Sequence, residues 1–256
     1  MKNKYVLVGI IILHIALFSM FIQVQASDSS NEKDDSDEFE IDDDEEFRIY
    51  DFDPEGDFYS VETEELYNPY FILSIGYRIT LEGYDEEEGI HILLDITVQD
   101  ETEIVAGIET RVVTEEEYED GEIVETSYNY FALDEDANVI YFGEASYEYD
   151  DEGNPVLDEG SWRADDPGNL PGIIMPGEFE KGDKYYQEYA PEVAMDRAEN
   201  IKHNKNFKTD LGKFKHCILI EETTPLEPDA EEIKIHAPGV GIIADEDLWI
   251  TFYGYV

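Results

Sequence analysis

Hydrophobic and polar residues alternate with a period of two over much of the chain. One face of residues 90–98 is apolar and carries Ile90, Ile92, Leu94, Ile96 and Val98. The same alternation resumes over residues 104–112, after a polar stretch at 99–103 that we interpret as a turn. Alternation of this kind is typical of half-buried antiparallel strands.

Further alternating runs follow at regular spacing, with Gly, Asn and Asp between them. We expect strands at residues 70–81, 123–133, 139–149, 213–222, 232–237 and 248–255. Short strands joined by such turns favour a mainly β fold, an antiparallel meander that forms a half-barrel, barrel or sandwich.

Two segments interrupt this pattern. Residues 165–177, DDPGNLPGIIMPG, contain three prolines and three glycines, which predicts a long ordered loop. Residues 191–204, PEVAMDRAENIKHN, begin with a proline suited to a first helical turn, and Val193, Arg197 and Ile201 are four residues apart. This second segment predicts one short helix.

The first residues indicate export. Met1 to Tyr5 include two lysines, an apolar stretch follows from Val6 to Ile22, and a small residue, Ala26, lies where a signal peptidase cuts. We therefore predict a signal peptide at 1–26, a disordered acidic leader at 27–46 and a single β-rich domain at 47–256. The alternative is an uncleaved N-terminal anchor, and in both cases the protein is secreted or associated with the cell surface.

The chain is strongly acidic, with 65 Asp and Glu residues against 16 Lys and Arg and a net charge of −49. Removing residues 1–26 takes away Lys2 and Lys4 and no acid, so the charge becomes −51. This charge argues against nucleic acid and anionic membrane surfaces as partners. It is compatible with loosely bound calcium, with a basic partner, or with solubility alone.

Two acidic turns, residues 134–138 and 150–154, could suggest calcium loops. An EF-hand requires glycine at position 6 and glutamate at position 12. The first turn has Val139 and Ala145 there, and the second has Pro155 and Ser161. Both are therefore predicted to be the tips of β-hairpins.

Catalytic and cofactor motifs give no assignment. The sequence has no Gly-x-Ser-x-Gly elbow, no His-Glu-x-x-His and no phosphate-binding glycine loop, so we predict no cofactor and assign no catalytic residue or metal ligand. The single cysteine, Cys217, allows no intramolecular disulfide and is predicted to be a buried structural thiol.

Apolar residues in and near the Pro/Gly segment are the best ligand candidates, because they must either fill the core or line the mouth of a pocket. The candidate residues are Trp162, Leu170, Ile173, Ile174, Met175, Tyr185 and Tyr186. We therefore predict a non-catalytic binding or surface protein that holds an apolar small molecule or a protein segment. The alternatives are an acidic surface protein that binds divalent cations and a hydrolase that uses carboxylates such as Asp183, Glu188 or Asp196.

Several strings occur together in a fixed order: YNYFALDEDANVIYFGE (128–144), GSW (160–162), PGIIMPGEFEKGDKYYQEY (171–189), TPLEP (224–228) and HAPGVGII (236–243). In this order they resemble a family of uncharacterised exported prokaryotic β-rich proteins, often of lipoprotein type, that share Asn-Val-x-Tyr-Phe-Gly-Glu. The resemblance implies export and a β-rich fold and implies no activity. The chain departs from the pattern in having Ala137 where a turn glycine is usual, Ile140 where an aromatic is common, and no lipidated cysteine.

Overall fold

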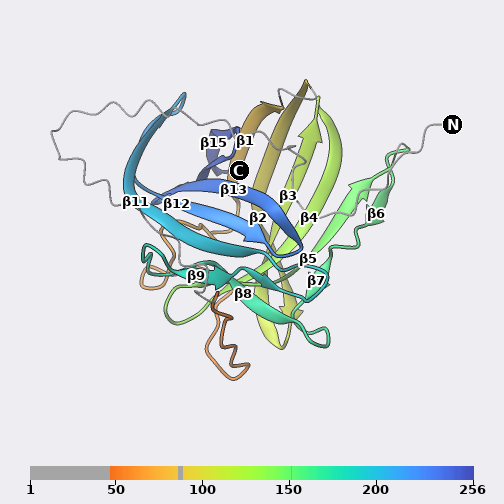
Figure 1. Ribbon diagram of the computed structural model, residues 1–256, viewed down its shortest axis with the longest axis vertical. Coiled ribbons are helices and arrows are strands. Elements are labelled where there is room, and N and C mark those ends of the chain that lie inside the picture. The colour runs from red at the N-terminus through yellow and green to blue at the C-terminus, as the bar shows by residue number, and fades with distance from the viewer. Residues whose placement is uncertain (1–46, 86–88, 151) are drawn as a thin grey trace.

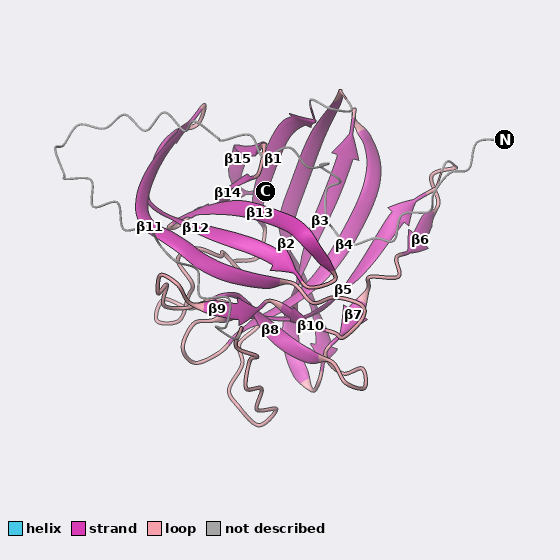
Figure 2. Cartoon of the chain, in the orientation of Figure 1, coloured by secondary structure: helices cyan, strands magenta, loops and turns pink. Residues whose placement is uncertain are grey.

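The computed structural model describes residues 47–85, 89–150 and 152–256, and in this part the regular structure consists of β-strands (Figure 2). The strands are β1 (Tyr77–Asp85), β2 (Ile90–Val105), β3 (Ile108–Glu119), β4 (Glu122–Leu133), β5 (Val139–Tyr149), β6 (Pro155–Leu157), β7 (Trp162–Arg163), β8 (Leu170–Met175), β9 (Lys184–Tyr186), β10 (Glu188–Tyr189), β11 (Arg197–Thr209), β12 (Gly212–Thr224), β13 (Glu227–Ala237), β14 (Gly241–Asp245) and β15 (Leu248–Tyr255). No helix occurs in the described ranges.

All strands belong to one antiparallel sheet that curves until its ends nearly meet. The order is β10-β8-β5-β4-β3-β2-β1-β15-β14-β13-β12-β11-β9, with β6 and β7 also paired to β5. The two terminal strands of this path, β9 and β10, are separated in sequence only by Gln187. Figure 1 shows the consequence, with β11–β13 passing in front of β2–β4. The sheet is thus nearly closed into a barrel.

The sequence-based fold class is confirmed in its main features, since the protein is mainly β and the sheet is antiparallel. The predicted strands at 139–149 and 248–255 coincide with β5 and β15, and 123–133 differs from β4 by one residue. The predicted strand at 70–81 begins too early, because β1 starts at Tyr77.

The predicted turn at residues 99–103 is wrong. These residues lie inside the long strand β2, which pairs with β3 on both sides of an irregularity between Val98 and Thr102. The chain turns instead at Ala106 and Gly107, which both have positive φ, 52° and 85°. Two positive φ angles are what a tight two-residue hairpin requires. A β-bulge in a polar stretch therefore looked like a turn in the sequence.

The predicted short helix at residues 191–204 is also wrong. Residues 191–193 form a turn, and from Arg197 the chain becomes β11, which pairs with β12 and β9. The four-residue spacing of Val193, Arg197 and Ile201 did not distinguish the two structures, because residues four apart share a side of a strand as well as of a helix. The available strand partners decided the outcome.

The Pro/Gly segment at residues 165–177 was expected to be a loop, but its second half is the strand β8. β8 pairs with β5 on one side and with β10 on the other, so it is an integral part of the sheet. Pro171 is the second residue of β8, close to the start of the strand, where a missing N–H is least costly.

The predicted signal peptide at 1–26 and the predicted leader at 27–46 lie outside the described residues, and these boundaries stay predictions. The described part contains no helix of the length and apolar character that a membrane-spanning helix needs.

Candidate ligand-binding cavity

The concave side of the sheet encloses a partly open cavity of about 180 Å³. Its walls come from both halves of the sheet, β1–β5 on one side and β12–β14 on the other, with β8 and β10 between them. The cavity therefore exists only because the sheet curves back on itself.

Part of the cavity lining is apolar and aromatic. Among the side chains that form it are Phe71, Tyr77, Ile79, Ile96, Val113 and Phe131. The rings of Phe71 and Phe131 meet with centroids 5.0 Å apart, and Phe131 stacks on Tyr141 at 4.7 Å. Such a surface can bury the apolar body of a ligand at about 25 cal/mol per Å² of area removed from water.

Another part of the lining is acidic, because acidic and apolar residues share the inward side of the same strands. On β3 both Val113 and Glu115 line the cavity, and Glu115 lies opposite the apolar Ile96 of β2. The carboxyl groups that line the cavity are Glu115, Glu144, Glu188, Asp196, Glu222 and Asp245. A cavity lined by both apolar and acidic side chains suits an amphipathic ligand.

Lys234 on β13 is the ammonium group that faces these acids. Its Nζ lies 2.6 Å from Glu222 Oε2, 3.7 Å from Glu232 Oε2 and 3.8 Å from Asp245 Oδ2. Burial alone would lower the pKa of Lys234, but Asp245, Glu222 and Glu232 raise it well above its usual value. Burial alone would raise the pKa of Glu222, but the Lys234 charge and hydrogen bonds from Lys234 and Gln187 lower it.

Tyr141 links two polar groups of the opposite wall. Its hydroxyl donates to Asn129 Oδ1, and the Tyr141 hydroxyl oxygen also lies 3.0 Å from Glu144 Oε2. Burial and repulsion by Glu125 and Glu115 raise the pKa of Glu144 to about 8, although the Tyr141 contact opposes the rise. The raised pKa favours the protonated form of Glu144, and Tyr141, which has a single O–H, donates to one of the two oxygens at a time.

Two acids come from the segment that joins the ends of the sheet. Glu188 lies on β10, and burial with repulsion by Asp196 and Glu144 raises its pKa well above the usual value. Asp196 precedes β11, and its backbone carbonyl accepts from the N–H groups of Gln187 and Glu188, at 2.8 and 3.1 Å. Burial and Glu222 raise the pKa of Asp196 to about 6.

His236 is neutral under ordinary conditions. It is 7% exposed, and its Nδ1 lies 3.2 Å from the carbonyl oxygen of Tyr70. Burial lowers its pKa to about 4. His236 therefore adds a polar edge to the cavity and no positive charge.

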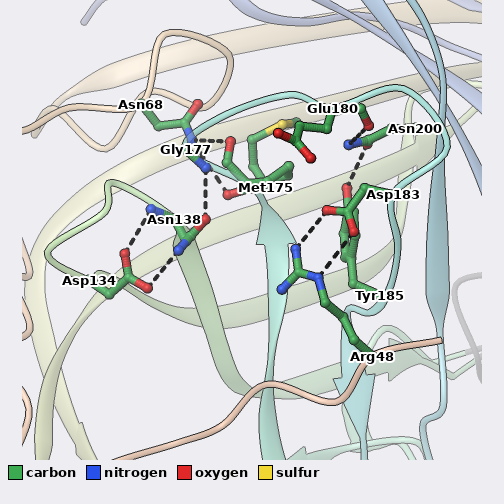
Figure 3. A network of polar contacts seen from close by, with 11 residues as sticks. Arg48, Asn68, Asp134, Asn138, Met175, Gly177, Glu180, Asp183, Tyr185 and Asn200 are labelled. Carbon is green, nitrogen blue, oxygen red and sulfur yellow. Dashed lines mark hydrogen bonds and ion pairs between the residues drawn. The ribbon is translucent and has the colours of Figure 1, made fainter.

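The end of β8 is fixed by a polar network around Asn68 (Figure 3). Asn68 is fully buried, and its Nδ2 donates to the carbonyl oxygens of Ala137 and Pro176, both at 3.0 Å. Asn138 Oδ1 accepts from the N–H of Gly177 at 2.9 Å. These bonds join the turn between β4 and β5 to the end of β8, beside the cavity residue Ile174.

A second network in Figure 3 fixes β9. Arg48 binds both carboxylate oxygens of Asp183, with Nη2 2.7 Å from Oδ2 and Nε 3.2 Å from Oδ1. Tyr185 donates its hydroxyl to Asn200 Oδ1 at 3.2 Å. Asp183 is thus engaged in this network and does not line the cavity, whereas Glu188 and Asp196 do.

The residues proposed from the sequence as ligand contacts are distributed over three environments. Ile174 lines the cavity. Trp162, Ile173, Met175 and Tyr185 are at most 2% exposed and belong to the core, Tyr186 is half-buried, and Leu170 is 37% exposed. The structure therefore brings one of the seven to the cavity.

Sequence reasoning missed most of the cavity, including Glu115, Glu144 and Lys234. The sequence did contain a sign of an inward-facing acid, because Glu222 follows Ile218 and Ile220 at two-residue intervals and so shares their side of the strand. It was hidden because acidic residues occur on both faces of these strands, as in the run of Glu115 to Glu117.

Other candidate chemistry is limited in the described ranges. They contain no group of three or more His, Cys, Asp or Glu residues arranged to hold a metal ion. Cys217 is fully buried, as expected, and burial raises the pKa of its thiol to about 11.

Fold and cavity together define an all-β protein with a nearly closed antiparallel sheet around an amphipathic cavity. The sequence matches no protein-family model and no curated protein. Among solved structures it is similar to that of a "putative lipoprotein" from Parabacteroides distasonis ATCC 8503, with 15% identity and a TM-score of 0.29 over 73% of this chain and 99% of that one. A TM-score this low carries no argument about fold or function, so the family resemblance and export stay predictions.

Proposed function

We propose that this protein is an exported binding protein that holds a small amphipathic molecule in the cavity of its curved sheet. The observation that carries the proposal is the cavity itself, whose lining combines apolar side chains such as Phe131 with carboxyl groups such as Glu115. The apolar side chains supply affinity through burial of carbon, and the polar groups orient the ligand. The predicted signal peptide at residues 1–26 supports export.

Calorimetric titration with 1-octanol, octylamine and octanoate tests this proposal, because the three share one apolar body. At least one should bind in a saturable way to a single site. Ile96 lines the cavity, so Ile96→Trp should fill the cavity and abolish binding. Ile104 is 56% exposed on the same strand, so Ile104→Trp is the matched control and should bind normally. Absence of saturable binding by all three compounds would refute the proposal.

Chain length provides a second readout. Each buried methylene contributes about 0.8 kcal/mol, so shortening the best octyl ligand by two methylenes should weaken binding about fifteenfold. A hexyl ligand that binds equally well would show that the alkyl chain is not held in the cavity.

A second candidate function is hydrolysis by carboxylates. Glu188 and Asp196 share the cavity with Glu222, and the pKa of Glu188 is raised while that of Glu222 is lowered. Carboxyl groups whose pKa values are pushed apart are suited to act as acid and base. Turnover of a panel of nitrophenyl glycosides and esters, lost in both Glu188→Gln and Glu222→Gln, would support it. No turnover in the wild-type protein would exclude those substrates.

Loose calcium binding by the acidic surface is a third proposal, motivated by the net charge of −49. The same calorimeter tests it directly, since heat of calcium binding at physiological salt is the expected result. Its absence would remove the proposal.

A further inference from the structure

Positive charge is scarce in the cavity. Six carboxyl groups line it, and Lys234 is the one Lys or Arg side chain among its described lining residues. Lys234 is already engaged by Glu222, Glu232 and Asp245. Among the described residues, Glu115, Glu144 and Glu188 form no ion pair with Lys or Arg within 4.0 Å. These three acids come from β3, β5 and β10, so carboxyl groups without a positively charged partner occur on separate walls of the cavity.

A hydrogen-bond donor at the same place also lacks a partner. Asn129 is 3% exposed and lines the cavity, and its Oδ1 accepts from Tyr141, but its Nδ2 has no partner. Unpaired buried donors are rare in folded proteins because each costs the free energy of a lost hydrogen bond. Asn129 Nδ2 therefore indicates that an acceptor oxygen belongs beside it.

We propose, on the basis of the function proposed above, that the cavity selects a small amphipathic amine. Its ammonium group lies among Glu115, Glu144 and Glu188, the carboxyl groups without a Lys or Arg partner, and an oxygen next to the ammonium group accepts from Asn129. Asn129 and Glu144 contact the same Tyr141 hydroxyl, so an ammonium group and an oxygen on adjacent carbons can reach both. The apolar body of the ligand then lies along Phe131 and Phe71. Anionic ligands with the same body are rejected by the excess of carboxylates.

Protonation gives this binding mode a specific signature. Burial and neighbouring acids raise the pKa of Glu115 to about 7 and that of Glu144 to about 8. These two acids interact with each other, and the other charged and titratable groups that act on them are Glu117, Glu125, Tyr141, Glu188, Asp196, Glu222, Lys234 and Asp245. An ammonium ligand favours the ionised carboxylates, so its binding should release protons to the buffer. A neutral ligand of the same size should release none.

The test is calorimetric titration of the protein with octylamine, 1-octanol and octanoate near pH 7, in two buffers of different ionisation enthalpy. Octylamine should bind at least about tenfold more tightly than 1-octanol, which corresponds to one favourable ion pair. Its apparent enthalpy should depend on the buffer, because protons are released, and octanoate should bind most weakly.

Matched variants locate the effect. Glu144→Gln and Glu115→Gln should each weaken the binding of octylamine, and the loss should be at least about fivefold larger than any loss of 1-octanol binding. Glu122 is exposed at the start of β4, so Glu122→Gln removes a carboxyl group outside the cavity. This variant should bind octylamine and 1-octanol with unchanged affinity. The compound 1-amino-2-octanol should bind more tightly than octylamine, and Asn129→Leu should abolish that difference.

The outcomes separate the two proposals. If 1-octanol or octanoate binds at least as tightly as octylamine, with no proton release, the amine inference is wrong and the binding function stands. If none of the three binds, the binding function itself is wrong. If the Glu→Gln variants in the cavity weaken 1-octanol as much as octylamine, the carboxyl groups do not recognise the ammonium group.

Discussion

At the scale of single residues, the two acidic turns are built in the same way. Asp134 Oδ1 accepts from the backbone N–H groups of Asp136 and Asn138, at 3.0 and 2.9 Å, and Asp150 Oδ1 accepts from those of Glu152 and Asn154, both at 2.9 Å. The first aspartate of each turn therefore binds its own backbone, as expected for a hairpin tip. In each turn the Oδ1 oxygen of the first aspartate is thus used to close the turn.

The fourth residue of each turn has a positive φ, and this position gives a prediction. Ala137 has a φ of 61°, where Gly153 of the second turn has 77°. A left-handed conformation costs alanine about 1–2 kcal/mol, part of which glycine loses again through its greater freedom when unfolded. We expect Ala137→Gly to stabilise the protein by about 0.5 kcal/mol in chemical denaturation. Gly153→Ala should destabilise it by about 1 kcal/mol. If Ala137→Gly destabilised the protein and Gly153→Ala stabilised it, φ would not be the cause.

Asn68 gives a second prediction at this scale. Its replacement by alanine leaves the carbonyl oxygens of Ala137 and Pro176 buried without their donor, which costs about 2–3 kcal/mol. The measurement is the urea midpoint, compared with that of Asn206→Ala. Asn206 is exposed on β11, so this control should stay within about 0.5 kcal/mol of the wild type. Equal effects of the two substitutions would contradict the role of Asn68.

At the scale of elements, the closure of the sheet depends on β8, a strand that the sequence pattern did not predict. The prolines and glycines of residues 165–177 predicted a loop, yet β8 within this segment joins β5 to β10. A glycine here has a packing reason: a Cβ added at Gly172 would lie 2.2 Å from the carbonyl oxygen of Gln187. Glycine thus permits the close approach of two backbones.

Gly172→Ala should therefore open the junction between β8 and β10. We expect a loss of about 2–3 kcal/mol in stability from the backbone clash. Because Glu188 lies on β10, ligand binding should weaken as well. Gly107→Ala is the comparison, since it lies in a distant hairpin with nothing within 4 Å of an added Cβ and is strained only through its φ of 85°. It should leave binding unchanged, and equal loss of binding in both variants would contradict a local effect at the junction.

At the scale of the whole molecule, the interior concentrates acids whose pKa values are raised by burial. The pKa of Glu115 and of Glu117 is about 7, and that of Glu144 and of Glu232 is about 8. A folded pKa above the unfolded value means that the folded state holds the proton more tightly. Stability should therefore rise as the pH falls from about 8 toward about 5.

Thermal unfolding at about pH 8.5 and about pH 5.5 checks this, with a higher Tm expected at the lower pH. Protonation of surface acids acts in the same direction, so Glu144→Gln isolates the interior contribution. This variant should raise Tm at about pH 8.5 and have little effect at about pH 5.5, because Glu144 is then already neutral. The exposed control Glu122→Gln should change Tm equally little at both pH values. A wild-type Tm that is lower at about pH 5.5 than at about pH 8.5 would contradict the role given to the buried acids.

The sequence by itself determined the fold class and most strands. Alternation with a period of two is a local property of a chain that buries one face, so β5 and β15 were located to the residue. It also identified the hairpin tips at Asp134 and Asp150, because an aspartate that binds its own backbone needs no distant partner.

Tertiary structure decided the rest, because the remaining outcomes depend on partners far away in the chain. Residues 197–209 became β11 instead of part of a helix because β12 offered backbone hydrogen bonds on one side and β9 on the other. The cavity arose in the same way. Glu115 and Lys234 are more than a hundred residues apart in sequence, and only the return of the sheet onto itself brings the acids and their one ammonium group to the same interior.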